Sequence, residues 1–179
     1  LYLGRNITSD FMSLAQLKEV IIGDLVTELP ERTFDGDAKI EKVIMGEGLK
    51  VIPASCFYRC ESLIEIHLPS ALQEIGYTAF YGCKSLRGIE FPSTLNRIDY
   101  HGFYGCAAIS SVKTLATIPP AAGNEMFDDG VYENAVLEVP KGTKTAYAAA
   151  DGWKNFTNIL SGNYNVTLFN LCCKFRSEW

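Results

Sequence analysis

Apolar residues recur along this chain at intervals of 23 residues. The two clearest copies read LIEIHLPSALQEIGYTAFYGCKS at 63–85 and LRGIEFPSTLNRIDYHGFYGCAA at 86–108. A fixed period of this length is the sequence signature of a repeat architecture. The same step connects five apolar columns, which are Leu17, Ile40, Leu63, Leu86 and Ile109; Val20, Val43, Ile66, Ile89 and Val112; Val26, Leu49, Leu72, Leu95 and Ile118; Leu29, Ile52, Ile75 and Ile98; and Phe34, Phe57, Phe80 and Phe103.

Each unit has too few apolar side chains to close a core alone, so the units on either side of it must cover them. Within a unit, Leu-x-x-Ile-x-Leu-Pro predicts a short strand that Pro69 or Pro92 ends, and Leu-x-x-Ile predicts a second short extended piece. We therefore expect over residues 1–135 a right-handed solenoid of mainly short parallel β-strands, with irregular and short helical returns and about five coils. Its first coil is expected to be shortened, with Leu3 in the place of Ile22.

The segment 136–161 is expected to close the array. The sequence TKTAYAAADGWKNFTNI is rich in helix formers up to Gly152, which predicts a short helix near 143–151. This segment is expected to lay large apolar side chains over the last coil, which would otherwise be open. They are Tyr147, Trp153, Phe156 and Ile159. The tail 162–179 has no period and is left unplaced.

The cysteine pattern argues against a disulfide framework. Three of the six cysteines, Cys60, Cys83 and Cys106, fall in one column of the repeat, so we expect them to stack inward as small apolar side chains. Three members of one ladder cannot all pair, which predicts free, buried thiols. Cys56 falls in a column of small residues and is interpreted as a packing position. The remaining two, Cys172 and Cys173, lie in the tail without a CxxC or Cys/His grouping.

Charge and motifs exclude several function classes. Sixteen Lys and Arg stand against twenty-one Asp and Glu, a net charge of −5, so nucleic acid is not an expected partner. No apolar run reaches about 18 residues, so we expect no transmembrane segment. Common hydrolase, dinucleotide and P-loop patterns are absent, and we expect no catalytic residue, cofactor or metal site. The acidic loops 34–39 and 127–134 leave calcium as an alternative, although Asp, Asn and Gly are turn residues first.

Two surface stripes are candidates for ligand contact, because a solenoid turns each variable column into a line of exposed side chains. The first lies on the strand face and is mixed and mostly polar; its candidate residues are Glu65, His67, Arg87 and Glu90. The alternative is a merely solvated sheet face. The second stripe follows the inward Phe column and consists of Tyr58, Tyr81 and Tyr104. Stacked tyrosines bind sugars or proteins, and the alternative is that they shield the edge of the loops.

The repeat LxxIxLPxxLxxIxxxAFxGC, visible at 63–83 and 86–106, resembles the BspA-type leucine-rich repeat of bacterial surface proteins. The closing stretch LEVPKGTKTAYAAADGWKNFTNI is similar to the segment that ends many such arrays. The resemblance covers about residues 1–161. It implies a leucine-rich-repeat solenoid in a cell-surface or secreted protein that serves adhesion or other macromolecular binding, and it implies no catalytic residues.

On that resemblance we expect a non-enzymatic, adhesin-like module that binds an extracellular protein or glycan, host matrix proteins among them. The alternative is a structural spacer that displays another domain of a larger surface protein. The strand-face columns separate the two hypotheses, because a spacer has no reason to carry a connected contact patch.

Overall fold

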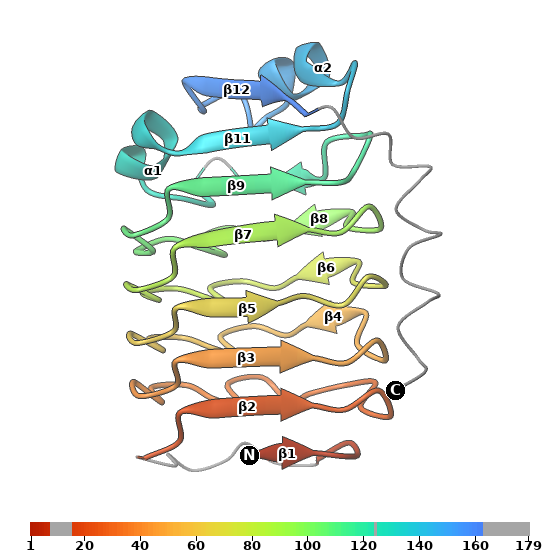
Figure 1. Cartoon of the computed structure of the whole chain (residues 1–179), viewed down its shortest axis with the longest axis vertical. Helices are drawn as coiled ribbons and strands as arrows, with labels where there is room; N and C mark the ends of the chain where they lie inside the picture. The colour runs from red at the N-terminus through yellow and green to blue at the C-terminus, as the bar shows by residue number, and fades with distance from the viewer. Residues whose placement is uncertain (8–15, 124, 163–179) are drawn as a thin grey trace.

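The chain forms one continuous stack of flat coils (Figure 1). The structure is a computed structural model that describes residues 1–7, 16–123 and 125–162. Cys172, Cys173 and the rest of the tail from residue 163 lie outside the described residues. Within the part described, no helix is long and apolar enough to cross a membrane.

Parallel strands on one side of the stack form its main face (Figure 1). Two four-stranded sheets adjoin there, ordered β1-β2-β3-β5 and β7-β9-β11-β12. The strands are β1 (Tyr2–Leu3), β2 (Glu19–Ile22), β3 (Lys42–Met45), β5 (Glu65–His67), β7 (Gly88–Phe91), β9 (Ser111–Thr114), β11 (Val136–Val139) and β12 (Asn158–Ser161). Successive coils pair in the 23-residue register, as Val20 with Val43 and Val43 with Ile66 show. The right-handed solenoid is confirmed.

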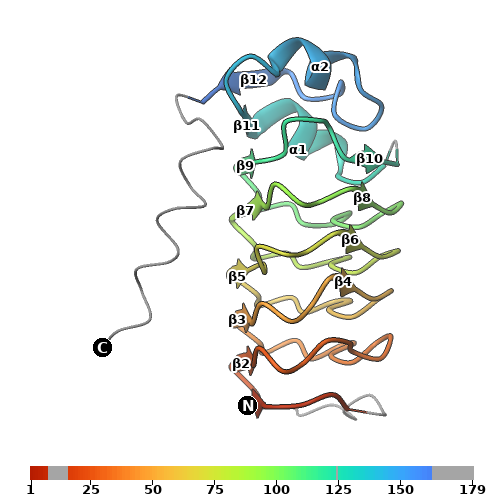
Figure 2. The ribbon, with the colours of Figure 1, turned by 90° about the vertical axis from the view of Figure 1, so that its right-hand side faces the viewer.

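In four of the coils the second extended piece joins a parallel sheet on the opposite side of the stack (Figure 2). It contains β4 (Val51–Ile52), β6 (Glu74–Ile75), β8 (Arg97–Ile98) and β10 (Ala121–Ala122). The shortened first coil is also present, because β1 pairs with β2 through Leu3 and Ile22. Alternation along each strand explains the two faces: in β2 Val20 and Ile22 are buried, while Glu19 is exposed.

A ladder of aromatic rings runs through the core between the two faces. Phe34, Phe57, Phe80 and Phe103 stack with ring centroids 5.0 to 5.2 Å apart, close to the spacing of neighbouring strands. The cysteine column lies beside this ladder. Cys60, Cys83 and Cys106 are buried and free, and each thiol donates to the carbonyl of the Phe 26 residues before it, at 3.1 to 3.3 Å. Buried Cys56 is free as well, so the predicted role of these four thiols in packing is confirmed.

The apolar register expected at Ile118 is wrong, because its side chain is 80% exposed. Two rings of the closing segment lie against the backbone there: Trp153 Nε1 donates to the Pro120 carbonyl and Tyr147 Oη to the Ala116 carbonyl, each at 2.8 Å. Both rings are fully buried, so they fill the interior that the Ile118 side chain occupies in the expected register. One coil later the Phe ladder resumes at Phe127, displaced by one residue from the period and stacked 5.4 Å from Phe103.

The closing segment both covers the stack and lengthens it. Its strands β11 and β12 continue the main sheet, so the solenoid has about seven turns, more than the five expected from the repeat alone. Helix α2 (Lys144–Ala149) lies within the range where a helix was expected, and α1 (Asp129–Asn134) was not anticipated. The four side chains that were expected to cover the last coil are all buried: Tyr147, Trp153, Phe156 and Ile159.

Replacing Trp153 with Ala should lower the free energy of unfolding by about 3 kcal/mol, the usual scale for losing a fully packed large aromatic side chain. The ring packs edge-on against Phe91 and Tyr147, with centroids 6.0 and 5.2 Å away. A denaturant titration measures the change, and Lys154→Ala, which alters an exposed neighbour, is the control. A loss below about 0.5 kcal/mol, the range of ordinary surface substitutions, would show that the segment caps nothing.

The four buried thiols should resist alkylation in the folded protein and react once it is unfolded. Burial raises the pKa of Cys56, Cys60 and Cys83, so little reactive thiolate forms at mildly alkaline pH. Mass spectrometry of the unreduced protein, labelled before and after unfolding in guanidinium chloride, measures this. A disulfide that involves Cys60, Cys83 or Cys106 would contradict the packing role of that column.

Candidate functional site

The candidate residues of the strand face are exposed, but most of their charges are already paired. Glu65 Oε1 lies 2.5 Å from His67 Nε2, and Lys42 reaches the other oxygen of Glu65 at 3.6 Å. Glu90 pairs with Lys113 at 3.0 Å. The structure therefore brings Glu65 and His67 together. It places Arg87 and Glu90 on the same face, without an ion pair between them among the described residues.

Ion pairs between successive coils recur on the surface. Lys18 and Glu41 lie 2.9 Å apart, and Lys84 and Glu61 lie 2.8 Å apart, each pair one repeat apart in sequence. Hydrogen bonding from Lys84 lowers the pKa of Glu61, and hydrogen bonding from His67, followed by the charge of Lys42, lowers the pKa of Glu65. Exposed pairs of this kind contribute little to stability. They pair part of the surface charge, so a partner that binds these groups through charge has to displace existing contacts.

The predicted tyrosines form a stack on the edge of the coils. Tyr58 and Tyr81 have ring centroids 5.0 Å apart, and Tyr81 and Tyr104 have centroids 5.8 Å apart. The Arg59 guanidinium lies over the Tyr58 ring, 5.5 Å from its centroid. All three tyrosines are half-buried. Because the faces of these rings largely cover one another, the stack presents ring edges and hydroxyl groups to solvent.

A second tyrosine stack, which the sequence analysis missed, lies next to the first. Tyr77 and Tyr100 are nearly parallel, with ring centroids 6.3 Å apart, and their exposed fractions are 51% and 43%. The signal was present in the sequence, since the two residues are one period apart. The run of tyrosines in this column is only two coils long, because Ala54 precedes the pair and Gly123 follows it.

His101 joins the two stacks. Its ring centroid lies 3.7 Å from that of Tyr100, 4.7 Å from Tyr104 and 6.1 Å from Tyr81. The backbone at His101 is left-handed, with φ of 59°, and Thr78 in the preceding coil has φ of 50° at the same place. This strained conformation recurs because the coil fixes it. We call this contiguous group the tyrosine surface: Tyr58, Tyr77, Tyr81, Tyr100, His101 and Tyr104.

An acidic side chain borders the tyrosine surface. Glu125 Oε2 accepts a hydrogen bond from Tyr100 Oη at 2.6 Å and lies 2.9 Å from His101 Nε2. These contacts lower the pKa of Glu125, with Tyr100 the larger cause and His101 the second. The same hydrogen bond to Glu125 raises the pKa of Tyr100. The carboxylate thereby fixes the orientation of both rings, although it is itself 57% exposed.

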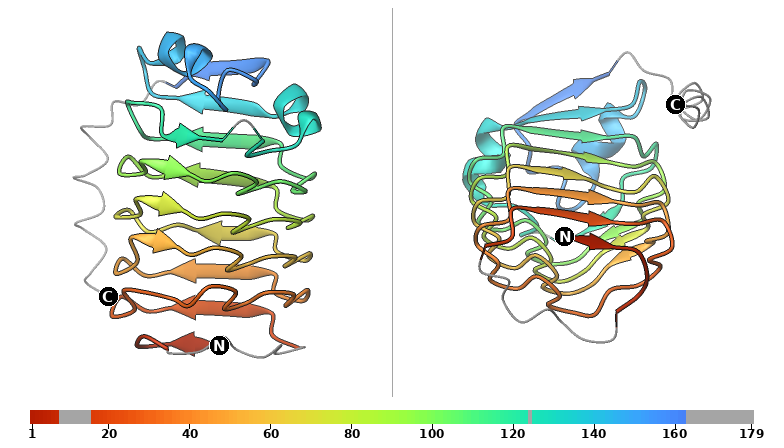
Figure 3. Two further views of the ribbon diagram at one scale, coloured as in Figure 1. Left: turned by 180° about the vertical axis from the view of Figure 1, so that it is seen from behind. Right: turned by 60° about the horizontal axis from the view of Figure 1, so that its bottom comes forward.

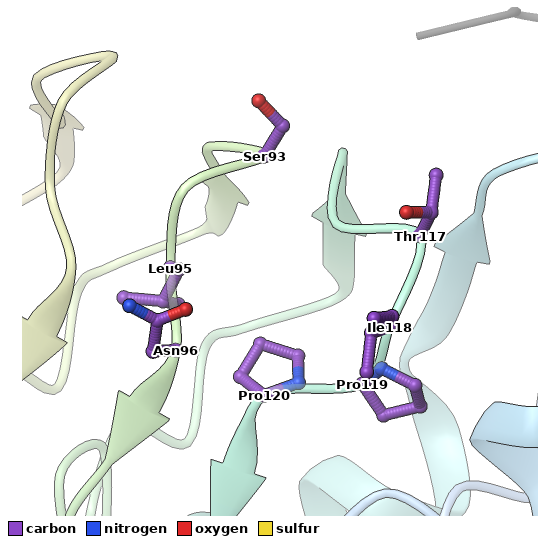
Figure 4. Close-up of a pocket in the computed structure, with 7 residues that line it drawn as sticks. All are labelled: Ser93, Leu95, Asn96, Thr117, Ile118, Pro119 and Pro120. Atoms are coloured by element: carbon purple, nitrogen blue, oxygen red, sulfur yellow. The ribbon is translucent and has the colours of Figure 1, made fainter.

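A small depression of about 210 Å³ lies between the coil of β8 and the segment before β10 (Figure 4). Its lining is neutral and includes the exposed Ile118. The lining residues are Ser93, Leu95, Asn96, Thr117, Ile118, Pro119 and Pro120. Among the described residues, no group of three or more His, Cys, Asp or Glu side chains is arranged to hold a metal ion.

Comparison with known proteins agrees with the architecture. Residues 6–128 match the profile of the family described as BspA type Leucine rich repeat region, in six copies. The curated proteins contain no significant match.

Solved structures of three bacterial proteins share the fold. The pneumococcal vaccine antigen PcpA is 17% identical with a TM-score of 0.67, and the match covers 87% of this chain and 44% of PcpA. A leucine-rich repeat protein from Bacteroides ovatus is 23% identical with a TM-score of 0.64, over 89% and 42% of the two chains. The leucine-rich repeat protein TpLRR of T. pallidum is 25% identical with a TM-score of 0.54, over 82% and 56%. The chain thus spans about half the length of each.

Removing the Tyr100 hydroxyl should raise the pKa of Glu125 toward the ordinary value of about 4.3. In the wild type this carboxyl should titrate at lower pH, because Tyr100 and His101 favour its charged form. The stabilisation is therefore present above the unfolded pKa and is lost as the pH falls through the folded pKa. A carboxyl NMR titration of Tyr100→Phe measures this, with Tyr77→Phe as the control. An ordinary Glu125 pKa in the wild type would contradict the hydrogen bonds described.

Proposed function

The chain belongs to the BspA type leucine-rich repeat family, and on that premise we propose that it is a non-enzymatic binding module which holds an extracellular protein at the tyrosine surface. The observation that carries the proposal is the contiguous group of five tyrosine rings in two stacks, which the ring of His101 joins. A membership of this family supports a place on the cell surface or in the secreted fraction of a bacterium, and we include that location in the proposal.

The physical properties of the tyrosine surface favour protein contact. Tyr side chains supply a large amphipathic area and have few rotatable bonds, so ordering them on binding costs little conformational entropy. Here the stacking and the hydrogen bond from Tyr100 to Glu125 fix several rings before any partner arrives. Tyr is also enriched among residues that dominate binding energy at interfaces. The outward edges offer both apolar contact and hydroxyl donors.

The strand face is a weaker candidate for the same role. Glu65 and Glu90 already pair with Lys42 and Lys113, so a partner has to replace existing contacts rather than add new ones. Binding through exposed charges would also weaken as salt rises, since such charges are screened within about 8 Å at physiological ionic strength. Contact through the tyrosine rings depends on buried area and responds much less to salt.

The paired charges of the strand face favour one second candidate, a structural spacer. On this face charges of opposite sign pair from coil to coil, as Lys42 does with Glu65 and Lys113 with Glu90, which suits a rigid spacer that does not bind its surroundings. A spacer accounts for that face, but it gives no reason for two exposed tyrosines stacked at Tyr77 and Tyr100.

The double variant Tyr81→Ser/Tyr104→Ser should weaken binding to an extracellular matrix protein about tenfold, which corresponds to about 1.4 kcal/mol. Arg87→Glu/Glu90→Lys, the matched change on the strand face, should alter it less than about twofold. Surface plasmon resonance against a panel of purified matrix proteins and mucin glycans, at low and physiological salt, measures both. Thermal unfolding of each variant verifies that it remains folded.

Three outcomes would overturn the proposal. Loss of binding with the charge variant alone would move the contact to the strand face. Binding to mucin glycans without any protein of the panel would replace the protein partner with a glycan. An affinity unchanged in both variants, or no binding to the panel at all, would favour the spacer.

A further inference from the structure

The pair Tyr77 and Tyr100 ends abruptly, and this leaves one ring face without a ring beside it. The coil before Tyr77 carries Ala54 at the same position, and Ser55 N donates to the Tyr77 carbonyl at 2.9 Å, which fixes that register. Neighbouring coils are about 4.8 Å apart, so a methyl group stands where a third ring would continue the stack. Tyr77 is 51% exposed. The strands β4 and β6, which these two residues follow in sequence, lie on the side of the stack opposite the main sheet (Figure 3).

The neighbouring stack shows what such a ring attracts. Tyr58 is the first ring of its stack, because Asp35 occupies its column one coil earlier. The Arg59 guanidinium lies over this ring, 5.5 Å from the centroid, within the range of a cation–π contact. Tyr77 is likewise the first ring of its stack, but among the described residues no cation lies over it.

A carboxylate is placed to complete the same kind of contact at Tyr77. Glu31 occupies the column of Tyr77 two coils earlier, with Ala54 between them, and it is exposed. Arg32, the cation next to it, pairs with Asp35 at 3.8 Å, and Glu31 forms no ion pair within the described part of the chain. Two coil spacings amount to about 10 Å. A cation that lies over the Ala54 side of the Tyr77 ring, up to about 6 Å from its centroid, is therefore on the side of the ring from which the exposed Glu31 side chain can reach it.

We infer that Tyr77, Ala54 and Glu31 form a notch that receives an arginine side chain of the protein partner. The inference rests on the proposed function and specifies the chemistry of one contact within it. Arg suits the notch better than Lys, because its planar guanidinium stacks on an aromatic face while its edge donates to a carboxylate. The net charge of −5 adds attraction for a basic partner segment. A pyranose also stacks on tyrosine, but the unpaired Glu31 charge favours a cation.

The probe is a short acetylated and amidated peptide with two arginines, compared with the same peptide carrying citrulline, which has the same shape without the charge. It is titrated into the full chain and followed by NMR of the Ala54 methyl and Tyr77 ring signals. The arginine peptide should shift both signals and bind about two- to fivefold more tightly than the citrulline peptide, as a cation–π contact of about 0.5 to 1 kcal/mol requires. The difference should shrink as salt rises, because Glu31 is exposed.

Two variants and their controls localise the contact. Ala54→Leu fills the notch and should abolish the shift of the Tyr77 ring signals, whereas Ala107→Leu, at an exposed position in another column, should leave that shift unchanged. Glu31→Gln should remove the preference for arginine, whereas Glu133→Gln on α1 should keep it. Thermal unfolding of every variant verifies that it is folded.

Equal binding of both peptides, shifts that persist in Ala54→Leu, or shifts produced by a methyl glucoside and not by arginine would each overturn the notch. These probes need no natural partner, so such a result would not refute the proposed function. The binding experiment with the Tyr81/Tyr104 and Arg87/Glu90 variants would still test that function. Conversely, the peptide could bind at the notch while no matrix protein binds at the tyrosine surface. That result would refute the proposed function but not the arginine-binding notch.

Discussion

Burial of each coil's apolar columns by the next coil is the constraint on which the rest of this structure depends. One coil cannot exclude water from its own Leu, Ile and Phe side chains, so it is stable only when its neighbours lie in register with it. The register then applies to every residue, inward or outward. The inner ladder of Phe34, Phe57 and Phe80 and the outer stack of Tyr58 and Tyr81 have nearly the same ring spacing, about 5 Å, because one backbone repeat sets both.

The periodic part of the fold was predictable because its contacts are local in the repeat. A column of identical apolar residues can be satisfied only by stacking, and the sequence therefore indicated the parallel strands, the inward Cys60 and the second sheet. The prediction was wrong at Ile118, where Trp153 and Tyr147 come from outside the repeat and fill the interior in its place. A column shows what repeats, but it does not show which distant side chain displaces a member of it.

The residues of the candidate site were likewise predictable only where they recur in one column. Tyr58, Tyr81 and Tyr104 were visible as a stripe because three coils carry the same residue at one place. Tyr77, His101 and Glu125 belong to different, adjacent columns, so no single column of the sequence shows them as one group, and their contacts depend on side-chain geometry. On the strand face the sequence showed which charges were present. It did not show that Glu65 and Glu90 are paired, because pairing depends on side-chain geometry between coils.

The separation of inward and outward columns bears on how such a molecule changes over generations. An in-frame duplication of one whole repeat inserts a new coil whose apolar residues already match the coils on both sides, so the core tolerates it. The same event copies the outward residues and lengthens a surface stripe by one step. A row of tyrosines can thus grow, shorten or shift along the rod by recombination between repeats, without any new solution to the packing problem. A change in the number of repeats can therefore alter the outward surface without disturbing the packing of the core.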